Sequence, residues 1–310
     1  MPDATLIQAV TVVQLALLLL IPIEMLLASR SWIRAEYDAR DTLANVTVSV
    51  GSIFFWGTLS WILLGVVALV YQHRRWEVPF TLGTFLIAFV AEDFRYYWWH
   101  RISHRSRWFW ASHVVHHSSQ HFNLSTNLRQ SWTSQFSGLI LMNVPLAYLG
   151  FNPALTGLAF SLNLIYQFWI HTEAIDRMPR WFEWLFNTPS HHRVHHASNA
   201  RYLDANYAGV LMIWDRLFGS FVAERDAEPA RYGLVRDLDT FNPLRIALHE
   251  YVAIARDQLR PSLTWAERLG YFFGPPGWRP GGLGHTTAAL RAADSARRAR
   301  AAVLGDSGTA

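Results

Sequence analysis

Apolar stretches separated by short polar segments fill the first 170 residues of the chain. A helix needs about 20 predominantly apolar residues to cross the hydrocarbon core of a bilayer. Five stretches are candidates for such helices: residues 6–28, 46–71, 80–99, 134–149 and 153–170. The connection between the last two is so short that we expect them to form a helical hairpin. The pattern predicts an all-α, multi-pass membrane bundle of about four or five spans or re-entrant helices.

Basic residues in the loops predict the orientation of this bundle, because cytoplasmic loops of membrane proteins carry an excess of Lys and Arg. Three arginines follow the first stretch: Arg30, Arg34 and Arg40. Alternation of the spans then places residues 100–133 and those after 171 on the cytoplasmic face, although Arg74 and Arg75 fall on the other side. The first stretch has no basic residue before it and no small-residue cleavage site after it, so we expect a retained membrane helix.

Beyond residue 170 the chain is more polar but stays rich in aromatic residues. The stretch WFEWLF at 181–186 resembles a short helix at a membrane interface. We expect one integral-membrane domain over residues 1–273, with its core at 90–245. A Gly/Pro-rich linker and an Ala/Arg-rich tail follow at 274–310 and are expected to be poorly ordered.

Composition limits the kinds of site and partner that the protein can have. Hydrophobic residues make up 51% and charged residues 16% of the chain, and its 15 Trp suit a membrane interface. The absence of Cys excludes disulfides, thiolate metal sites and cysteine nucleophiles. A net charge of +4 would also fit a nucleic-acid-binding protein. The basic residues lie beside apolar stretches and in the tail, so we expect a lipid bilayer and no nucleic acid as partner.

Eleven of the 14 histidines lie between His100 and His196. Residues three or four apart on a helix lie on one face, so two imidazoles at that spacing can reach one metal ion. Clustered imidazoles repel one another when protonated, and packing alone does not explain three such motifs. The motifs predict a cytoplasmic, histidine-rich helical cap that binds two metal ions. One HxxxH and two HxxHH motifs supply the eight ligands: His100, His104, His113, His116, His117, His192, His195 and His196.

Ligand type alone leaves the metal open, because imidazole binds zinc, copper, iron and nickel. The HExxH motif of common zinc hydrolases is absent. All-nitrogen ligation by so many histidines suits a pair of redox-active irons better than one Lewis-acid zinc. We therefore expect two iron ions that activate O2, with zinc able to substitute in a purified sample.

Further polar residues are expected around the metals. Asn163, Gln167 and His171 are spaced by four, and a polar stripe on a membrane helix should face inward. We expect His171 to be a ligand, and His191, directly before the last motif, stays open as one. The other candidates follow that motif: Asp204, Asn206 and Tyr207.

Three acidic residues in or near the apolar stretches need an explanation, because an ionised carboxylate is costly in a membrane helix. Asp93 lies seven residues before His100 and shares its helix face, so we expect it to accept a hydrogen bond from a ligating imidazole. For Glu92 a salt bridge with Arg95 or Arg101 is the alternative to such a role. Glu24 is expected to be an interface residue.

Histidine motifs set among apolar stretches resemble the fatty acid hydroxylase and sterol desaturase superfamily of membrane non-haem di-iron enzymes. Within this superfamily, the sequence around the histidine motifs, over residues 90–245, resembles the alkylglycerol monooxygenases. The resemblance implies an O2-dependent monooxygenase that hydroxylates a lipid C–H bond, cleaves an ether lipid and uses tetrahydrobiopterin. The stretches that carry it are YYWWHR from 96, HHSSQHFNLSTNLRQS from 116, IYQFWIHTEAI from 165, NTPSHHRVHH from 187 and NYAGVLMIWDRLFGSF from 206.

Other functions stay open at this point. A sterol or fatty-acyl hydroxylase or desaturase would use the same scaffold. A metal transporter is a remote alternative, because transporter ligands lie near the bilayer midplane within broken spans. Without Cys or a flavin or haem domain, electrons must come from a bound pterin or an external donor. We expect lipid to enter from the bilayer between the stripe Asn163, Gln167 and His171 and the aromatic residues 96–99.

Overall fold

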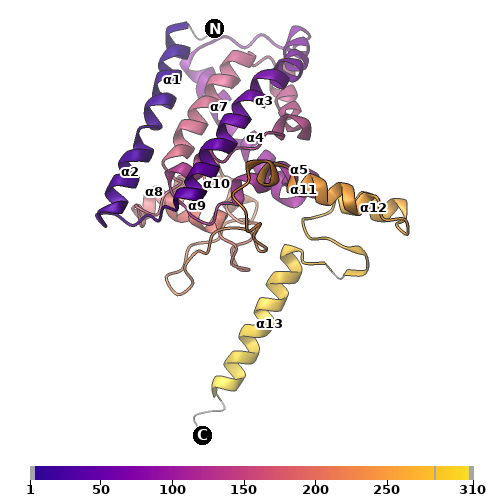
Figure 1. Ribbon diagram of the computed structural model, residues 1–310. Helices are drawn as coiled ribbons and strands as arrows, with labels where there is room; N and C mark the ends of the chain where they lie inside the picture. The colour runs from indigo at the N-terminus through magenta and orange to yellow at the C-terminus, as the bar shows by residue number, and fades with distance from the viewer. Residues whose placement is uncertain (1–3, 283, 307–310) are drawn as a thin grey trace.

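The computed structural model describes residues 4–282 and 284–306, which form helices joined by loops (Figure 1). Within these residues there is no β-sheet, only two isolated bridges, Phe186–Leu211 and Arg225–Glu228. The all-α prediction is therefore confirmed for the described part of the chain. The α-helices are α1 (Ala4–Leu17), α2 (Leu20–Ser29), α3 (Ala39–Gln72), α4 (Leu82–Arg105), α5 (Arg107–His117), α6 (Val144–Leu149), α7 (Pro153–Phe168), α8 (Arg180–Leu185), α9 (Pro189–His196), α10 (Ile213–Leu217), α11 (Pro243–Gln258), α12 (Trp265–Phe273) and α13 (Thr287–Asp306).

The long apolar helices run side by side, and the shorter helices gather at one end of them (Figure 1). Helices α1, α3, α4 and α7 make up the bundle, and α4 packs on both α7 and α5. Helices α5, α8, α9, α10, α11 and α12 lie at the end where α4 finishes, and α13 projects away from them. The bundle thus delivers the end of α4, with its histidines, to a polar layer of short helices.

Fewer helices than expected are long and apolar enough to cross a membrane. The stretch Gln8–Ser29, which comprises most of α1 and α2, meets that test. The two halves of α3, Ala39–Trp56 and Ser60–Gln72, meet at 49° and would count as a second span if taken together. No other described helix qualifies. Charged residues in the second half of α4 and the 16-residue length of α7 explain why these two do not.

The expected helical hairpin over residues 134–149 and 153–170 is present in its second arm only. Its first arm consists of two 3₁₀ helices, η2 (Ser134–Ser137) and η3 (Leu139–Asn143), followed by the short α6. Gly138, with φ of 79°, adopts a left-handed conformation that interrupts a right-handed helix. Pro145 then sits in the first turn of α6, where its missing N–H costs nothing. An apolar stretch of the right length is therefore broken by its backbone chemistry.

The described residues of the C-terminal segment, which the sequence predicts as poorly ordered, make contacts with the rest of the protein. The backbone N–H of Arg107 donates to the carbonyl of Gly274 over 2.8 Å. In α13, Arg291 donates to the carbonyl of Leu203, and Arg298 pairs with Glu228 at 2.7 Å. These contacts attach the segment close to the loops that follow α9.

Candidate metal centre

Nine imidazoles meet at the junction of α4, α5, α7 and α9 in two groups. Within each group the potential ligand atoms lie within 4.8 Å of one another, and every residue is buried. The five-histidine group is His100, His104, His113, His117 and His195. The four-histidine group is His116, His171, His192 and His196.

Local helix geometry divides each HxxHH motif between the two groups. On α5, His113 and His117 are four residues apart and face the five-histidine group, whereas His116 faces the other. On α9, His192 and His196 face the four-histidine group, and His195 faces the other. The rings of His117 and His196 stack with centroids 4.3 Å apart, so the groups touch. Two metal ions bound here would therefore be neighbours.

Imidazole nitrogens within the groups lie at the spacing that a shared cation imposes. The Nε2 atom of His100 lies 2.9 Å from that of His113, and the Nε2 atoms of His171 and His192 are also 2.9 Å apart. Metal–imidazole bonds of about 2.1 Å that meet near a right angle place two nitrogens about 3 Å apart. The observed spacing fits metal ligation in both groups.

In three of the histidines the opposite ring nitrogen fixes the tautomer. The Nδ1 atoms of His100, His171 and His195 lie 2.8, 2.8 and 2.9 Å from the backbone carbonyls of Tyr207, Gln167 and Ala205. A carbonyl only accepts, so each Nδ1 carries the proton and each Nε2 presents a lone pair to its group. Such a hydrogen bond is the usual outer partner of a metal-bound imidazole.

Burial and neighbouring imidazoles keep these side chains neutral. Burial lowers the pKa of His116 to about 4 and the pKa of His195 to about 3. Burial, and then the neighbouring histidines, also lower the pKa of His100 well below 6.5. In addition, Nε2 of His104 and Nε2 of His195 are buried and have no hydrogen-bond partner among the described residues. Buried, neutral nitrogens without partners fit a metal ion.

Asp93 lies under the site but does not contact an imidazole through any hydrogen bond of the described residues. Its carboxylate instead accepts four hydrogen bonds of 2.7–3.0 Å, from the backbone N–H groups of Val210 and Leu211, the indole of Trp214 and the side-chain amide of Asn163. The residue therefore holds the segment after α9 against α4 and α7. Glu92 makes the alternative contact, a salt bridge with Arg95.

The polar stripe of α7 is closed against α4. The side-chain amide of Gln167 donates to Asn163, and the hydroxyl of Tyr96 donates to Gln167 over 2.8 Å. Gly209 lies against this stripe, because a Cβ atom there would be 2.6 Å from Oδ1 of Asn163. The expected lipid entrance between the stripe and the aromatic residues 96–99 is thus filled by direct hydrogen bonds. That expectation is wrong for the structure described.

The three candidates after the last motif have different surroundings. The carboxylate of Asp204 lies 3.8 Å from Nδ1 of His104, and burial raises its pKa. The ring centroid of Tyr207 lies 5.4 Å from that of His104, and its buried hydroxyl has no hydrogen-bond partner among the described residues. Asn206 instead ties the chain together, donating to the carbonyls of His191 and Val222.

His191 lies outside both imidazole groups. Its ring packs on Phe221 with centroids 5.4 Å apart and lines a separate cavity of about 300 Å³ with Glu183 and Arg216. Adjacent residues on a helix point about 100° apart, so the ring next to a ligand faces elsewhere. His121 is likewise apart, and its Nδ1 lies 3.9 Å from the carboxylate of Glu36.

A cavity of about 470 Å³ borders both imidazole groups. His104, His117, His195 and His196 line one side of it, together with Trp110 and Val114. The C-terminal segment supplies another side through Pro276, Gly277, Thr287 and Leu290. The cavity places an apolar and a charged surface next to the potential metal ligands, with Asp204, Arg236 and Glu250 in its lining.

Sequence reasoning missed several residues that support the site. The amide of Asn127 lies 3.3 Å from Nδ1 of His171, and the carboxylate of Asp215 accepts the backbone N–H groups of Tyr207 and Ala208. Glu24 is buried rather than interfacial and accepts the backbone N–H of Leu124. The sequence signal that could have indicated such supporting residues is the run of small polar residues after the first HxxHH motif, which is unusual between apolar helices.

Comparison with known proteins supports the same reading of the histidines. The family model for fatty acid hydroxylase matches residues 85–220. Human alkylglycerol monooxygenase is 38% identical over 261 residues, which cover 81% of this chain and 56% of that protein. Alkylglycerol monooxygenase of Danio rerio is 43% identical over 206 residues, which cover 66% of this chain and 45% of that protein.

A cholesterol 25-hydroxylase-like protein of Danio rerio is more distant, with 28% identity over 54% of this chain and 66% of that protein. No solved structure matches the chain. The chain spans about half the length of the alkylglycerol monooxygenases that it matches. Residues 85–220 contain all nine histidines of the two groups. The histidine-bearing part of this chain thus matches the family model for fatty acid hydroxylase, and the chain is similar to alkylglycerol monooxygenases over part of their length.

Proposed function

We propose that this protein is an O2-dependent lipid monooxygenase that acts in the manner of an alkylglycerol monooxygenase. The observation that carries the proposal is the division of nine buried, neutral imidazoles into two touching groups. We infer that each group holds one iron, since imidazole ligands suit iron and the family oxidises lipids; zinc can replace it in purified protein. Bound iron would supply the reductive activation of O2.

The proposed reaction replaces one C–H bond of a lipid with C–OH. The second oxygen atom of O2 leaves as water, and an external donor provides two electrons and two protons. In an alkylglycerol, hydroxylation of the carbon bonded to the ether oxygen gives a hemiacetal, which breaks down to an aldehyde and glycerol.

The cavity beside the histidines is where we place the reacting end of the lipid. His104, His117, His195 and His196 face it, and Val114 adds apolar surface. Tyr207 is not among the residues that line the cavity, but its ring lies beside that of His104 and its buried hydroxyl has no hydrogen-bond partner among the described residues. Asp93 and Asn163 act at a distance, because they hold the segment that carries Tyr207.

The proposed reaction takes its electrons from a donor outside the chain. The chain has no Cys for an iron–sulfur centre. We propose tetrahydrobiopterin or a soluble reductase, either of which would approach from the polar side, where the C-terminal segment borders the cavity. A bound pterin and a protein donor are distinguished by adding each to purified enzyme.

We also propose that the bundle spans a bilayer and that the metal centre lies at its cytoplasmic face. Large apolar side chains are exposed along the bundle, among them Ile53, Phe54, Leu86 and Ile87. Such a surface is stable in lipid and costly in water. The arginines after α2 assign the side of the short helices to the cytoplasm.

The test is to supply purified, iron-loaded protein with 18O2 and one of three lipids: an alkylglycerol, a fatty acyl lipid and a sterol. Each reaction is run with tetrahydrobiopterin, with a reductase system, or with neither. We expect 18O-labelled aldehyde from the alkylglycerol. We expect no desaturated product. His104→Ala is the inactive control, and His73→Ala, which alters a residue outside the site, should behave as wild type.

Desaturation without oxygen insertion, or label only in the sterol, would replace the proposed substrate by one of the alternatives. Oxidation that His104→Ala and wild type support equally would remove the metal centre from the reaction.

A further inference from the structure

We propose that two acidic residues of the N-terminal helices, Glu24 and Asp41, are positioning residues for the four-histidine group. The inference rests on the proposed function, because it assumes that this group binds a metal ion. Both residues lie outside the stretch that matches the fatty acid hydroxylase family, residues 85–220. Among the described residues no hydrogen bond or ion pair joins either acid to an imidazole, so any effect on a bound metal must pass through the residues that they hold.

The segment of residues 118–129, here called the linking segment, connects the two acids to the site. It follows directly after His116 and His117 on α5 and ends at Arg129. Its residue Asn127 lies 3.3 Å from Nδ1 of His171. The segment therefore adjoins two members of the four-histidine group, one through the chain and one through space.

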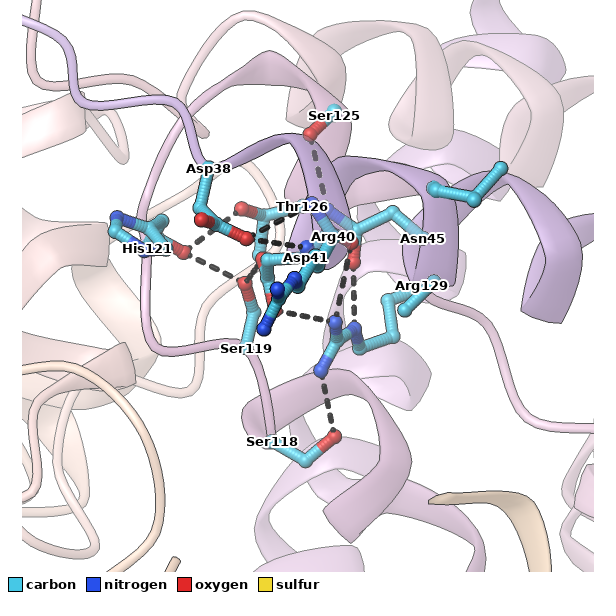
Figure 2. A network of polar contacts seen from close by, with 12 residues as sticks. Asp38, Arg40, Asp41, Asn45, Ser118, Ser119, His121, Ser125, Thr126 and Arg129 are labelled. Atoms are coloured by element: carbon cyan, nitrogen blue, oxygen red, sulfur yellow. Dashed lines mark hydrogen bonds and ion pairs between the residues drawn. The ribbon is translucent and has the colours of Figure 1, made fainter. Parts of the chain in front are cut away.

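Asp41, near the start of α3, binds the linking segment at both ends (Figure 2). One carboxylate oxygen accepts from the guanidinium of Arg129 over 2.5 Å, and the other accepts from the hydroxyl of Ser119 over 2.5 Å. The same guanidinium donates to Ser118 over 3.1 Å and to Asn45 over 2.5 Å. The ion pair joins the beginning of a long helix to the residues that follow the HxxHH motif.

This ion pair is almost completely shielded from water. The exposed fractions of the Arg129 and Asp41 side chains are 2% and 3%. A buried guanidinium without its carboxylate is strongly unfavourable, so loss of Asp41 charge must be answered by movement of Arg129 or entry of water. Either response displaces Ser118 and Ser119, and with them the end of α5, which carries His116 of the four-histidine group and His117 of the five-histidine group.

Glu24, in the middle of α2, binds the middle of the linking segment and the chain next to His171. Its carboxylate accepts the backbone N–H of Leu124 over 2.8 Å and the hydroxyl of Tyr37 over 2.5 Å. It also accepts the hydroxyl of Thr172, the residue directly after His171. Glu24 thus fixes the distance between the linking segment and the histidine that follows α7.

The five-histidine group is held by different residues. Nδ1 of His100 and Nδ1 of His195 bond to the carbonyls of Tyr207 and Ala205, which lie after α9. The hydrogen bonds described for Glu24 and Asp41 reach neither of these carbonyls. The two acids are connected to His116 and His171 of the four-histidine group, but to the five-histidine group only through His117 at the end of α5, so damage to them should affect the four-histidine group more strongly.

The experiment compares Asp41→Asn and Glu24→Gln with wild type, since both variants keep side-chain volume and remove charge. Metal content per chain is measured after loading with iron, and the protein is also loaded with Co²⁺ to record the ligand-field spectrum of each site. We expect wild type to hold two ions and each variant to approach one, with loss of one Co²⁺ spectral component. Glu92→Gln is the matched control, because this buried acid pairs with Arg95 on its own helix.

Two results would overturn the inference. Retention of two ions with an unchanged Co²⁺ spectrum would show that the acids do not position the group. Loss of both ions in parallel with helix content would show a general structural role. If Asp41→Asn does not fold, Ser119→Ala and Thr172→Val remove single contacts to the same acids, and a second ion that binds as in wild type would count against the proposal. Wild type holding only one ion would instead refute the two-metal proposal itself.

Discussion

Whether a histidine can bind metal depends on where its ring nitrogens lie. His104 and His171 present Nε2 atoms to the two groups, whereas His191 packs against Phe221. We expect His104→Ala and His171→Ala each to lower metal content by about one ion and to reduce turnover by at least about 100-fold. Elemental analysis and product formation measure both effects. His191→Ala should retain both ions, and loss of metal in that variant comparable with His104→Ala would contradict the assignment.

The carboxylate of Asp93 is an acceptor for four donors, and no amide can replace it. In Asp93→Asn, one side-chain atom becomes a donor that faces other donors. We expect a loss of about 1–3 kcal/mol in the free energy of unfolding, as for other buried polar groups left unpaired. Turnover should fall while metal content stays near that of wild type, because Asp93 holds the segment of Tyr207 rather than an imidazole. Metal loss equal to that in His104→Ala would mean that it acts on the ligands.

The lowered pKa values of the histidines predict how acid affects the metal-free protein. An unfolded histidine takes up a proton near pH 6.5, whereas His116 and His195 in the folded chain do so only at about 4 and about 3. Stability is therefore unaffected above pH 6.5 and is lost as the pH falls from 6.5 toward those values. Thermal unfolding of chelated protein should show a melting temperature that decreases over this window.

The matched control for the acid effect is His73→Ala, which should leave the pH dependence unchanged. His116→Gln should make it shallower, because one buried imidazole no longer titrates. A melting temperature independent of pH between about 6.5 and 4.5 would contradict the buried, neutral state of the groups.

At the scale of helices, α12 has an exposed apolar face. Trp265, Leu269 and Phe273 are four residues apart and 83%, 59% and 52% exposed. The opposite face is packed, since Tyr271 is buried and Gly270 lies under Trp278. A stripe of this kind on a helix that crosses the bundle axis is typical of the bilayer interface (Figure 1).

The absence of Cys in the chain makes this location directly measurable. A spin label on Leu269→Cys in protein reconstituted into lipid bilayers should be more accessible to O2 than to a water-soluble nickel complex. The same label on Ala292→Cys, an exposed position of α13, should show the reverse. Equal accessibility at the two positions would place α12 in water, and spin–spin coupling between chains would indicate that a second copy covers it.

Helix content and the histidine motifs could be predicted from the sequence because both depend on local spacing. Residues 153–170 carry an apolar pattern in which Asn163 and Gln167 are confined to one helix face, and they form α7 up to Phe168. Residues 134–149 have a similar pattern, but Gly138 and Pro145 impose backbone angles that hydrophobicity does not report. Apolar length predicts a helix only where the backbone permits one.

The division of the histidines between the two groups could not be predicted from local spacing. That His113 and His116 face different imidazole groups depends on where α9 and α7 pack against α5, which is tertiary information. The same holds for Glu24, whose partners Leu124 and Thr172 are 100 and 148 residues away. A carboxylate in an apolar stretch indicates that a partner exists but not which one it is.

For the whole molecule, the composition of the two groups has a consequence for their charge. Both consist of imidazoles, which are neutral when they bind metal, so two divalent ions would bring about four positive charges into a buried site. The carboxylate of Asp204, 3.8 Å from Nδ1 of His104, is close enough to offset part of that charge. Neutral ligands favour the lower oxidation state of an iron because they do not compensate the added charge of the higher one. The resting centre should therefore have a high reduction potential and a strong affinity for small anions such as azide.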